Sequence, residues 1–132
     1  MIDFSALESE IMDLFTGAYS FKSTSTGRIR EVVPNSSMPS CDVAVGESRT
    51  QSFAGYEEFR TPVTAVMRLS STKRNTGEAT LKIILETVRE ALTGVTGTNF
   101  NVLREIEARA TDEESGDGSS IRIGLVTMTA IS

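Results

Sequence analysis

The sequence contains no histidine and no tryptophan, and its only cysteine is Cys41. Without histidine, the usual zinc-binding spacings cannot occur, and Ser-His-Asp or Cys-His nucleophile systems are excluded. A single cysteine cannot form a disulfide within the chain. Any catalysis would have to rest on carboxylates, lysine or backbone groups, and no motif gathers these into a catalytic site. We therefore expect no catalytic residue, no bound metal and no cofactor.

Long apolar runs and basic clusters are missing as well. No apolar run approaches the roughly 20 residues of a membrane span, and the N-terminus carries an acid, Asp3, where an export signal would carry base. We expect no membrane association. The formal net charge of -5 argues against gripping DNA, because that requires clustered lysine and arginine to neutralise phosphates. The residues Arg28, Arg30, Lys73 and Arg74 are too few and too scattered for a nucleic-acid site.

The clearest structural signals lie between residues 60 and 94. Over 62–70, one set of alternate side chains is apolar and the other set is mostly polar. This period of two is typical of a half-buried strand. Beyond it, Asn75 and Glu78 have the spacing of a capping box, and Gly94 can end a helix. Between them, apolar residues recur at intervals of three and four. The apolar set of the strand is Val63, Ala65, Met67 and Leu69, and that of the helix is Leu81, Ile84, Leu85, Val88 and Leu92.

The remaining patterns complete a single α+β domain over residues 1–132, a length that suits one core. Short strands are predicted over 28–33 and 41–46, and 23–27 reads as a turn. We expect a mixed or antiparallel β-sheet of about four to five strands with two helices packed on one face. The principal elements are a helix over 2–16, a long loop over 46–61, a central strand over 62–71, a helix over 76–93 and a C-terminal β-hairpin over 102–131.

The segment 46–61 is long for a connection between two strands, and such connections are usually functional or disordered. It holds three of the eight aromatic residues of the chain. These rings either pin the segment to the core or act as anchors offered to a partner. The candidate partner-binding and oligomer-binding residues are Arg49, Phe53, Tyr56, Glu57, Glu58, Phe59 and Arg60.

The turn of the predicted C-terminal hairpin, 112–120, is acidic and rich in glycine. Its acids do not follow the register of an EF-hand loop, which favours a solvated hairpin tip. A calcium-dependent binding module or a small carboxylate enzyme using Asp112, Glu114 and Asp117 is the alternative from a different functional class.

The order of elements resembles that of the tail terminator proteins of long-tailed bacteriophages, also called tail-completion, minor tail or neck proteins. The resemblance covers nearly the whole chain and is one of order and size. It is carried by Met38–Val45 (a proline followed by a short strand), by 61–70, by 77–92 and by a closing strand that ends in Leu125–Met128. The chain has no Trp in the long loop, where such proteins often carry an aromatic residue, and Phe53, Tyr56 and Phe59 could substitute for it.

The resemblance implies a structural virion protein at the neck end of the tail, assembled in the host cytoplasm. It would form a ring, usually a hexamer, that caps the tail tube, ends its polymerisation and joins the tail to the head. The implied partners are the tail tube protein, neck and head-tail connector proteins, and a sheath protein if the tail is contractile. DNA would pass through without specific binding. Another neck or tube component is the alternative. The candidate acids of the channel wall are Glu105, Glu107, Asp112, Glu113, Glu114 and Asp117.

Overall fold

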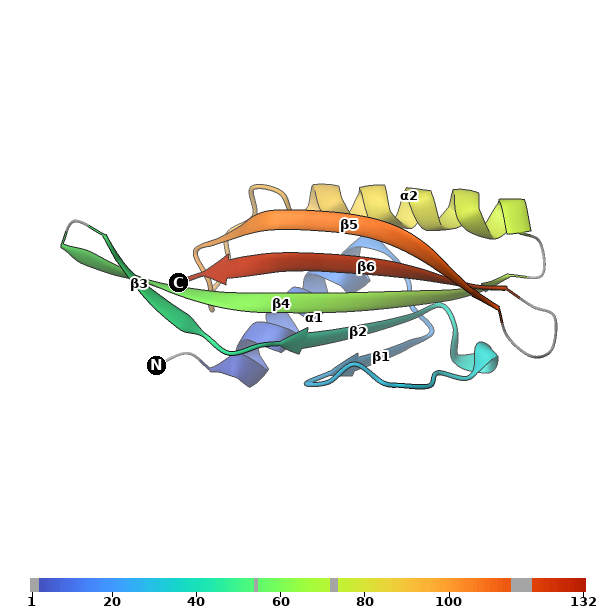
Figure 1. Ribbon diagram of the computed structural model, residues 1–132, viewed down its shortest axis with the longest axis horizontal. Helices are drawn as coiled ribbons and strands as arrows, with labels where there is room; N and C mark the ends of the chain where they lie inside the picture. Colours follow the sequence, from blue (N-terminus) through green and yellow to red (C-terminus); the bar gives the residue numbers. More distant parts are fainter. Residues whose placement is uncertain (1–2, 54, 72–73, 115–119) are drawn as a thin grey trace.

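Six strands form one mixed sheet, and two helices lie on one of its faces (Figure 1). This computed structural model describes residues 3–53, 55–71, 74–114 and 120–132. The elements are α1 (Phe4–Ala18), β1 (Ser23–Thr26), a short 3-10 helix (Asn35–Ser37), β2 (Ser40–Val45), β3 (Arg49–Phe53), β4 (Tyr56–Ser71), α2 (Arg74–Leu92), β5 (Val102–Glu114) and β6 (Ser120–Ile131). The strand order is β1-β2-β4-β6-β5, with β3 paired to the start of β4. The predicted α+β fold is confirmed, with one strand more than the upper expectation.

Strand β4 is the centre of the sheet. It pairs antiparallel with β2 on one side and with β6 on the other, while β1 joins β2 in parallel. Val63, Ala65 and Met67 point to the helices and are buried. The alternation in the sequence therefore marks the face of β4 that forms the core, as expected for a strand covered on one side.

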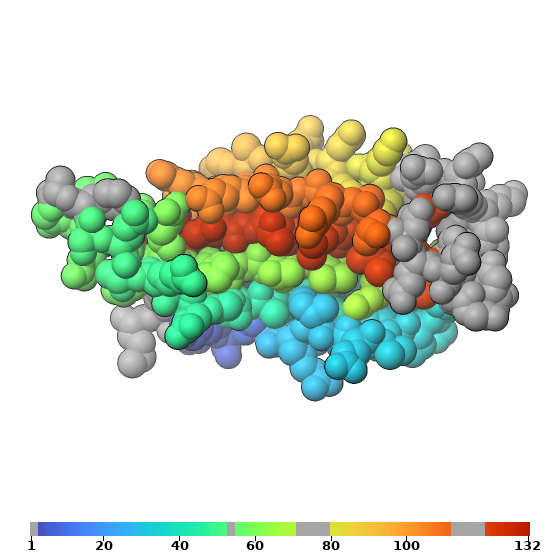
Figure 2. Space-filling model, in the orientation of Figure 1, coloured from blue at the N-terminus to red at the C-terminus, as the bar shows by residue number. Residues whose placement is uncertain are grey.

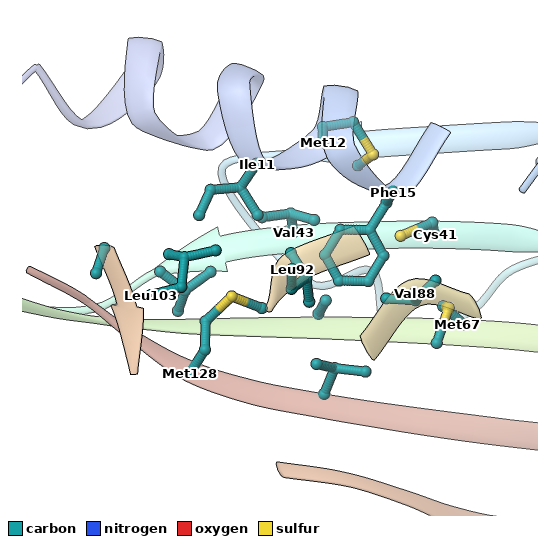
Figure 3. Packing of buried hydrophobic residues seen from close by; sticks show 14 of the residues in the cluster. Ile11, Met12, Phe15, Cys41, Val43, Met67, Val88, Leu92, Leu103 and Met128 are labelled. Atoms are coloured by element: carbon teal, nitrogen blue, oxygen red, sulfur yellow. The ribbon is translucent and has the colours of Figure 1, made fainter. Parts of the chain in front are cut away.

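Both helices contribute an apolar stripe to the same core (Figure 3). Asp3 caps α1 by accepting a hydrogen bond from the backbone N–H of Ala6 at 3.1 Å, which satisfies one of the unpaired donors of the first turn. Phe15 of α1 lies among Cys41 and Val43 of β2 and Val88 of α2. The buried apolar helix residues are Leu7, Ile11, Met12 and Phe15 of α1 and Leu81, Ile84, Leu85, Val88 and Leu92 of α2.

Gly124 on β6 lets α2 approach the sheet closely. A β-carbon at this position would lie 3.1 Å from both Leu81 and Leu85 and 3.3 Å from Met67. Such contacts are too tight for a well-packed core without displacement of its neighbours. The absence of a side chain at Gly124 therefore sets the spacing between helix and sheet.

Two predictions for residues 23–33 were wrong. The first strand is Ser23–Thr26, which was predicted as a turn, and 28–33 is irregular instead of extended in a sheet. Ser23 to Thr26 pair with Ser40 to Val43, so the strand forms because β2 offers a free edge. A run of serine and threonine gives no apolar alternation, and its strand conformation depends on this distant partner.

The prediction of a long loop over 46–61 was also wrong. Most of this segment is β-structure, because β3 pairs with residues 56–60 and β4 begins at Tyr56, six residues before the predicted central strand. Phe53 pairs with Tyr56, which leaves two residues between the strands, and Gly55 has a φ of 95°. A two-residue connection with glycine in a positive-φ conformation is typical of a tight β-hairpin.

Strand β5 does not keep a single alternation of its side chains along its length. The register with β6 shifts between Arg104 and Glu107, and Glu105 has a φ of 57°. Leu103, on one side of this β-bulge, and Ala108, on the other, both face the helices. Strict alternation along a strand would put Val102 and Ala108 on one face, but the extra residue of the bulge puts them on opposite faces.

Candidate interaction surface

Residues 49–60 form a two-stranded arm that extends from one end of the sheet (Figure 1). They comprise β3 and the first five residues of β4. The cross-strand pairs of the arm are Arg49 with Arg60, Thr50 with Phe59, Gln51 with Glu58, Ser52 with Glu57, and Phe53 with Tyr56. In the described part of the chain β3 pairs only with β4, so the arm is two strands wide.

Two of the predicted aromatic anchors are exposed on the arm. Tyr56 is 62% exposed and Phe59 is 41% exposed. Because neighbouring residues of a strand point to opposite sides, these rings lie on different faces of the arm. Neither ring belongs to the buried core cluster, so the alternative that they pin the segment to the core does not hold for these two. Glu57 is exposed and Glu58 is half-buried.

The base of the arm is held by polar contacts to three strands. The guanidinium of Arg60 donates to Gln51 Oε1 at 3.0 Å and to Glu105 Oε1 at 3.3 Å, and Thr129 donates to Glu105 Oε2 at 2.9 Å. Backbone hydrogen bonds of 3.2 and 2.9 Å join Phe59 to Ser132. The arm therefore leaves the sheet from a fixed base.

A groove of about 540 Å³ lies at this base. Its walls carry charges of both signs, and Arg60 and Glu105 are already paired with each other within it. Such a lining suits a polar surface of a partner better than an apolar small molecule. The groove is lined by Glu47, Arg49, Thr50, Gln51, Arg60, Pro62, Glu105 and Thr129.

The face of the sheet opposite the helices is turned to the viewer in Figure 2. We call it the open face. On it, Leu125 of β6 pairs with Val66 of β4 on one side and with Arg109 of β5 on the other, and Ile123 lies two residues along β6. Ile123 and Leu125 are half-buried, and Arg109 is exposed. The middle of this face is thus an apolar strip with a cation beside it.

At its β2 side the open face carries a buried ionic cluster. Asp42 is fully buried and accepts from Arg30 Nε at 2.8 Å, from the Arg30 backbone N–H at 3.1 Å and from Arg68 Nη1 at 2.9 Å. Arg68 also donates to the Arg30 carbonyl at 2.7 Å. These bonds fix the irregular 28–33 segment against β2. No local sequence pattern predicts this cluster, because its members lie far apart in the chain.

The predicted acidic residues that the structure describes all lie on β5. Glu105 and Glu107 both lie on β5 and are exposed, and Glu105 is paired with Arg60. Among the described side chains, the partner-binding set and the acidic set meet at this pair. Asp112, Glu113 and Glu114 belong to the end of β5, and Asp117 lies outside the described residues, as does most of the loop proposed for the metal-binding alternative.

Cys41 is the only thiol, and it is buried in the core. Burial raises its pKa to about 12, with a further rise from the charge of Asp42 and an opposing effect from Arg30. A thiol in this state is protonated at neutral pH and is a poor nucleophile. Among the described side chains, no group of three Cys, Asp or Glu residues is placed to hold a metal ion. The described helices also lack the length and apolar character needed to cross a membrane.

The fold is that of an α+β domain whose sheet is covered by helices on one face only. No protein-family model and no curated protein sequence matches the chain. Twenty-three chains of solved structures match it. One is a chain of the "Virion of native gene transfer agent (GTA) particle", with a TM-score of 0.53 and 13% sequence identity, over 97% of this chain and 96% of that chain. At this identity the likeness shows a shared fold, and it extends over nearly the full length of both chains.

Proposed function

We propose that this chain is a structural component of a phage-like virion and acts as a tail terminator. In this role it forms a ring, of about six copies, that caps the tail tube, ends tube polymerisation and joins the tail to the head-neck connector. The observation that carries the proposal is the fold likeness over 97% of the chain to a chain of a gene transfer agent virion. The order of elements in the sequence, which resembles tail terminators, supports the same role independently.

The surfaces of the molecule suit such an assembly. A closed ring requires heterologous contacts, in which one patch meets a different patch on the next copy. The arm supplies a projecting patch, and its Arg49, Phe53, Tyr56, Glu57, Glu58, Phe59 and Arg60 are the proposed partner-binding residues. Strand β5 supplies a long sheet edge, and exposed edges pair readily with other chains unless charges or bulges protect them.

The charge of the chain suits a conduit for DNA. The net charge of -5 favours passage of DNA without binding, since acidic walls repel phosphate. Glu105 and Glu107 are exposed on β5 and are candidates for such a wall, together with Asp112, Glu113, Glu114 and Asp117. The proposed partners are further copies of the chain, a tail tube protein, connector proteins and, in a contractile tail, a sheath protein.

The mass of the purified protein in solution tests the proposal. Light scattering at several concentrations, followed by negative-stain imaging, is expected to show rings with an open centre, either free or after addition of tail tubes. Capping of isolated tubes distinguishes a terminator from another neck or tube component. A protein that stays monomeric and neither binds nor caps tail tubes would contradict the proposed function.

A further inference from the structure

The open face has an apolar strip that the helices do not cover. Val66, Leu125 and Ile123 lie along neighbouring positions of β4 and β6, on the face opposite the core residues Ala65 and Met67. In Figure 2 these strands are seen between β5 and the segment that precedes β2. Val66 is 9% exposed, and Ile123 and Leu125 are half-buried, so the strip is open to solvent mainly along β6. An apolar surface of this kind favours contact with a further layer.

The arm cannot supply that layer to its own chain. Its second strand is a direct continuation of β4, so it leads away from the sheet (Figure 1). Tyr56, Glu58 and Arg60 alternate along this strand and point to the same side as Val66. A two-stranded hairpin is only marginally stable without a packing partner. An arm with this geometry gains a second layer only from another molecule.

The charges of the two surfaces are complementary. Arg109 stands beside Leu125 on the open face, and its side chain has no hydrogen bond or ion pair to any residue that the structure describes. Glu57 and Glu58 on the arm are likewise without a partner among the described residues. An arm laid on the strip with its Tyr56 side brings the Glu58 carboxylate to this guanidinium, whereas Glu57 points to the other side of the arm. Charge pairs at the rim of a contact mainly fix its orientation and partner choice.

We propose that the arm of one copy packs on the open face of a second copy, with Tyr56 over the strip of Val66, Ile123 and Leu125 and Glu58 beside Arg109. The inference rests on the proposed function, because it specifies the contact between neighbours in the ring. The two patches differ, so the contact is head-to-tail and can repeat from copy to copy until the ring closes.

Site-directed cross-linking tests this contact. Tyr56→Cys and Leu125→Cys are made in separate chains, mixed in equal amounts and treated with a short bismaleimide. Cys41 can stay in place, because it is buried and protonated. The expected result is a covalent dimer that joins the two variants. Its yield is expected to be at least about fivefold higher than the yield from a control mixture of Tyr56→Cys and Ile83→Cys. Ile83 is the matched control, since it is 64% exposed on α2.

Charge reversal provides a second test that does not depend on the cysteine variants folding. Glu58→Arg and Arg109→Glu are each expected to weaken self-association by about tenfold, and the combination of the two is expected to restore it to within about twofold. Circular dichroism checks that all three variants fold. Single variants that associate like the original chain, or a double variant without restoration, would contradict the arm contact.

The outcomes separate this inference from the proposed function. Rings that form normally but give no cross-link above the Ile83→Cys control would overturn the arm contact and leave the ring in place. A chain that neither cross-links nor forms rings, alone or with tail tubes, would overturn both. Cross-linking of Tyr56→Cys to an added tube protein, with none between copies, would reassign the arm to the tube and also overturn the contact proposed here.

Discussion

Arg60 of β4 and Glu105 of β5 form an ion pair across the end of β6, with 3.3 Å between Nη2 and Oε1. Glu105 reaches this position from a β-bulge in which its own φ is 57°. The side chains of Arg60 and Glu105 are 30% and 64% exposed, so the pair itself contributes at most about 1 kcal/mol. Its main consequence is geometric, because it ties the base of the arm to the edge strand.

The backbone at Glu105 gives the first prediction. Glu105→Gly is expected to be more stable than Glu105→Ala by about 1 kcal/mol, because a side chain at φ 57° is strained and glycine is not. Both variants lose the ion pair, so their difference reports the backbone alone. Urea denaturation measures it. Arg109 in the regular part of β5 is the control, and there the alanine variant is expected to be more stable than the glycine variant. A Glu105→Ala variant more stable than Glu105→Gly would contradict the assigned bulge.

Asp42 gives the second prediction. Asp42→Asn is expected to lower the free energy of unfolding by about 3–5 kcal/mol, because it leaves Arg30 and Arg68 without their shared buried carboxylate. Chemical denaturation measures the loss. Glu57→Gln, at an exposed position of the arm, is the control and is expected to change stability by less than about 0.5 kcal/mol. Equal effects of the two variants would show that the cluster does not hold the 28–33 segment.

The buried thiol gives the third prediction, on alkaline pH. Burial raises the pKa of Cys41 in the folded chain to about 12, from 9.0. Between these values the unfolded chain releases the thiol proton while the folded chain keeps it, so stability is lost as pH rises from 9 towards 12. The loss amounts to about 1.4 kcal/mol per pH unit within this window. Denaturation curves of the original chain and Cys41→Ala, compared at pH 8 and pH 11, isolate this contribution.

Cys41 reactivity gives a simple check of the same burial. At pH 8 the folded chain is expected to react with a maleimide only at the rate set by transient opening, whereas the unfolded chain in urea reacts at once. Labelling of the folded chain as fast as that of the unfolded chain would contradict the burial of this thiol.

Two glycines give a fourth prediction, with effects of opposite sign. Gly97→Ala is expected to destabilise the fold by about 1–3 kcal/mol, because its β-carbon would displace Glu10 and the buried ring of Phe100. Glu10 would then lose the N–H groups of Thr98 and Asn99 that it accepts at 2.7 and 3.1 Å. Thermal unfolding measures the effect.

The matched variant is Gly17→Ala in the last turn of α1, where nothing lies within 4 Å of the new β-carbon. It is expected to raise stability by up to about 1 kcal/mol, because alanine has the higher helix propensity. Stabilisation by Gly97→Ala, or marked destabilisation by Gly17→Ala, would contradict the packing described at these two sites.

Periodicity explains which parts of the fold could be predicted. The alternation at Val63, Ala65 and Met67 marked the core side of β4, and the three-and-four spacing from Leu81 to Leu92 marked the buried stripe of α2. These patterns are local, because a strand or helix covered on one face must repeat its apolar residues with its own period. The α+β class and the two helices on one face follow from them.

Local sequence patterns predict the candidate interaction surface only in part. The aromatic content of the segment predicts a contact surface at Phe53, Tyr56 and Phe59, but the same sequence predicts a loop where the structure has the two-stranded arm. The tight connection at Gly55 was the available signal for a hairpin. Nothing local indicated that Arg60 would meet Glu105, 45 residues further along the chain.

By itself, the sequence determined the fold class, the buried faces of its regular elements and the absence of histidine-based chemistry. Tertiary structure alone decided the strand at Ser23–Thr26, the bulge at Glu105 and the burial of Asp42 between Arg30 and Arg68. Each of these depends on groups that are distant in the chain. A polar strand needs a partner edge, and a buried carboxylate needs cations brought to it, so neither leaves a pattern in its own neighbourhood.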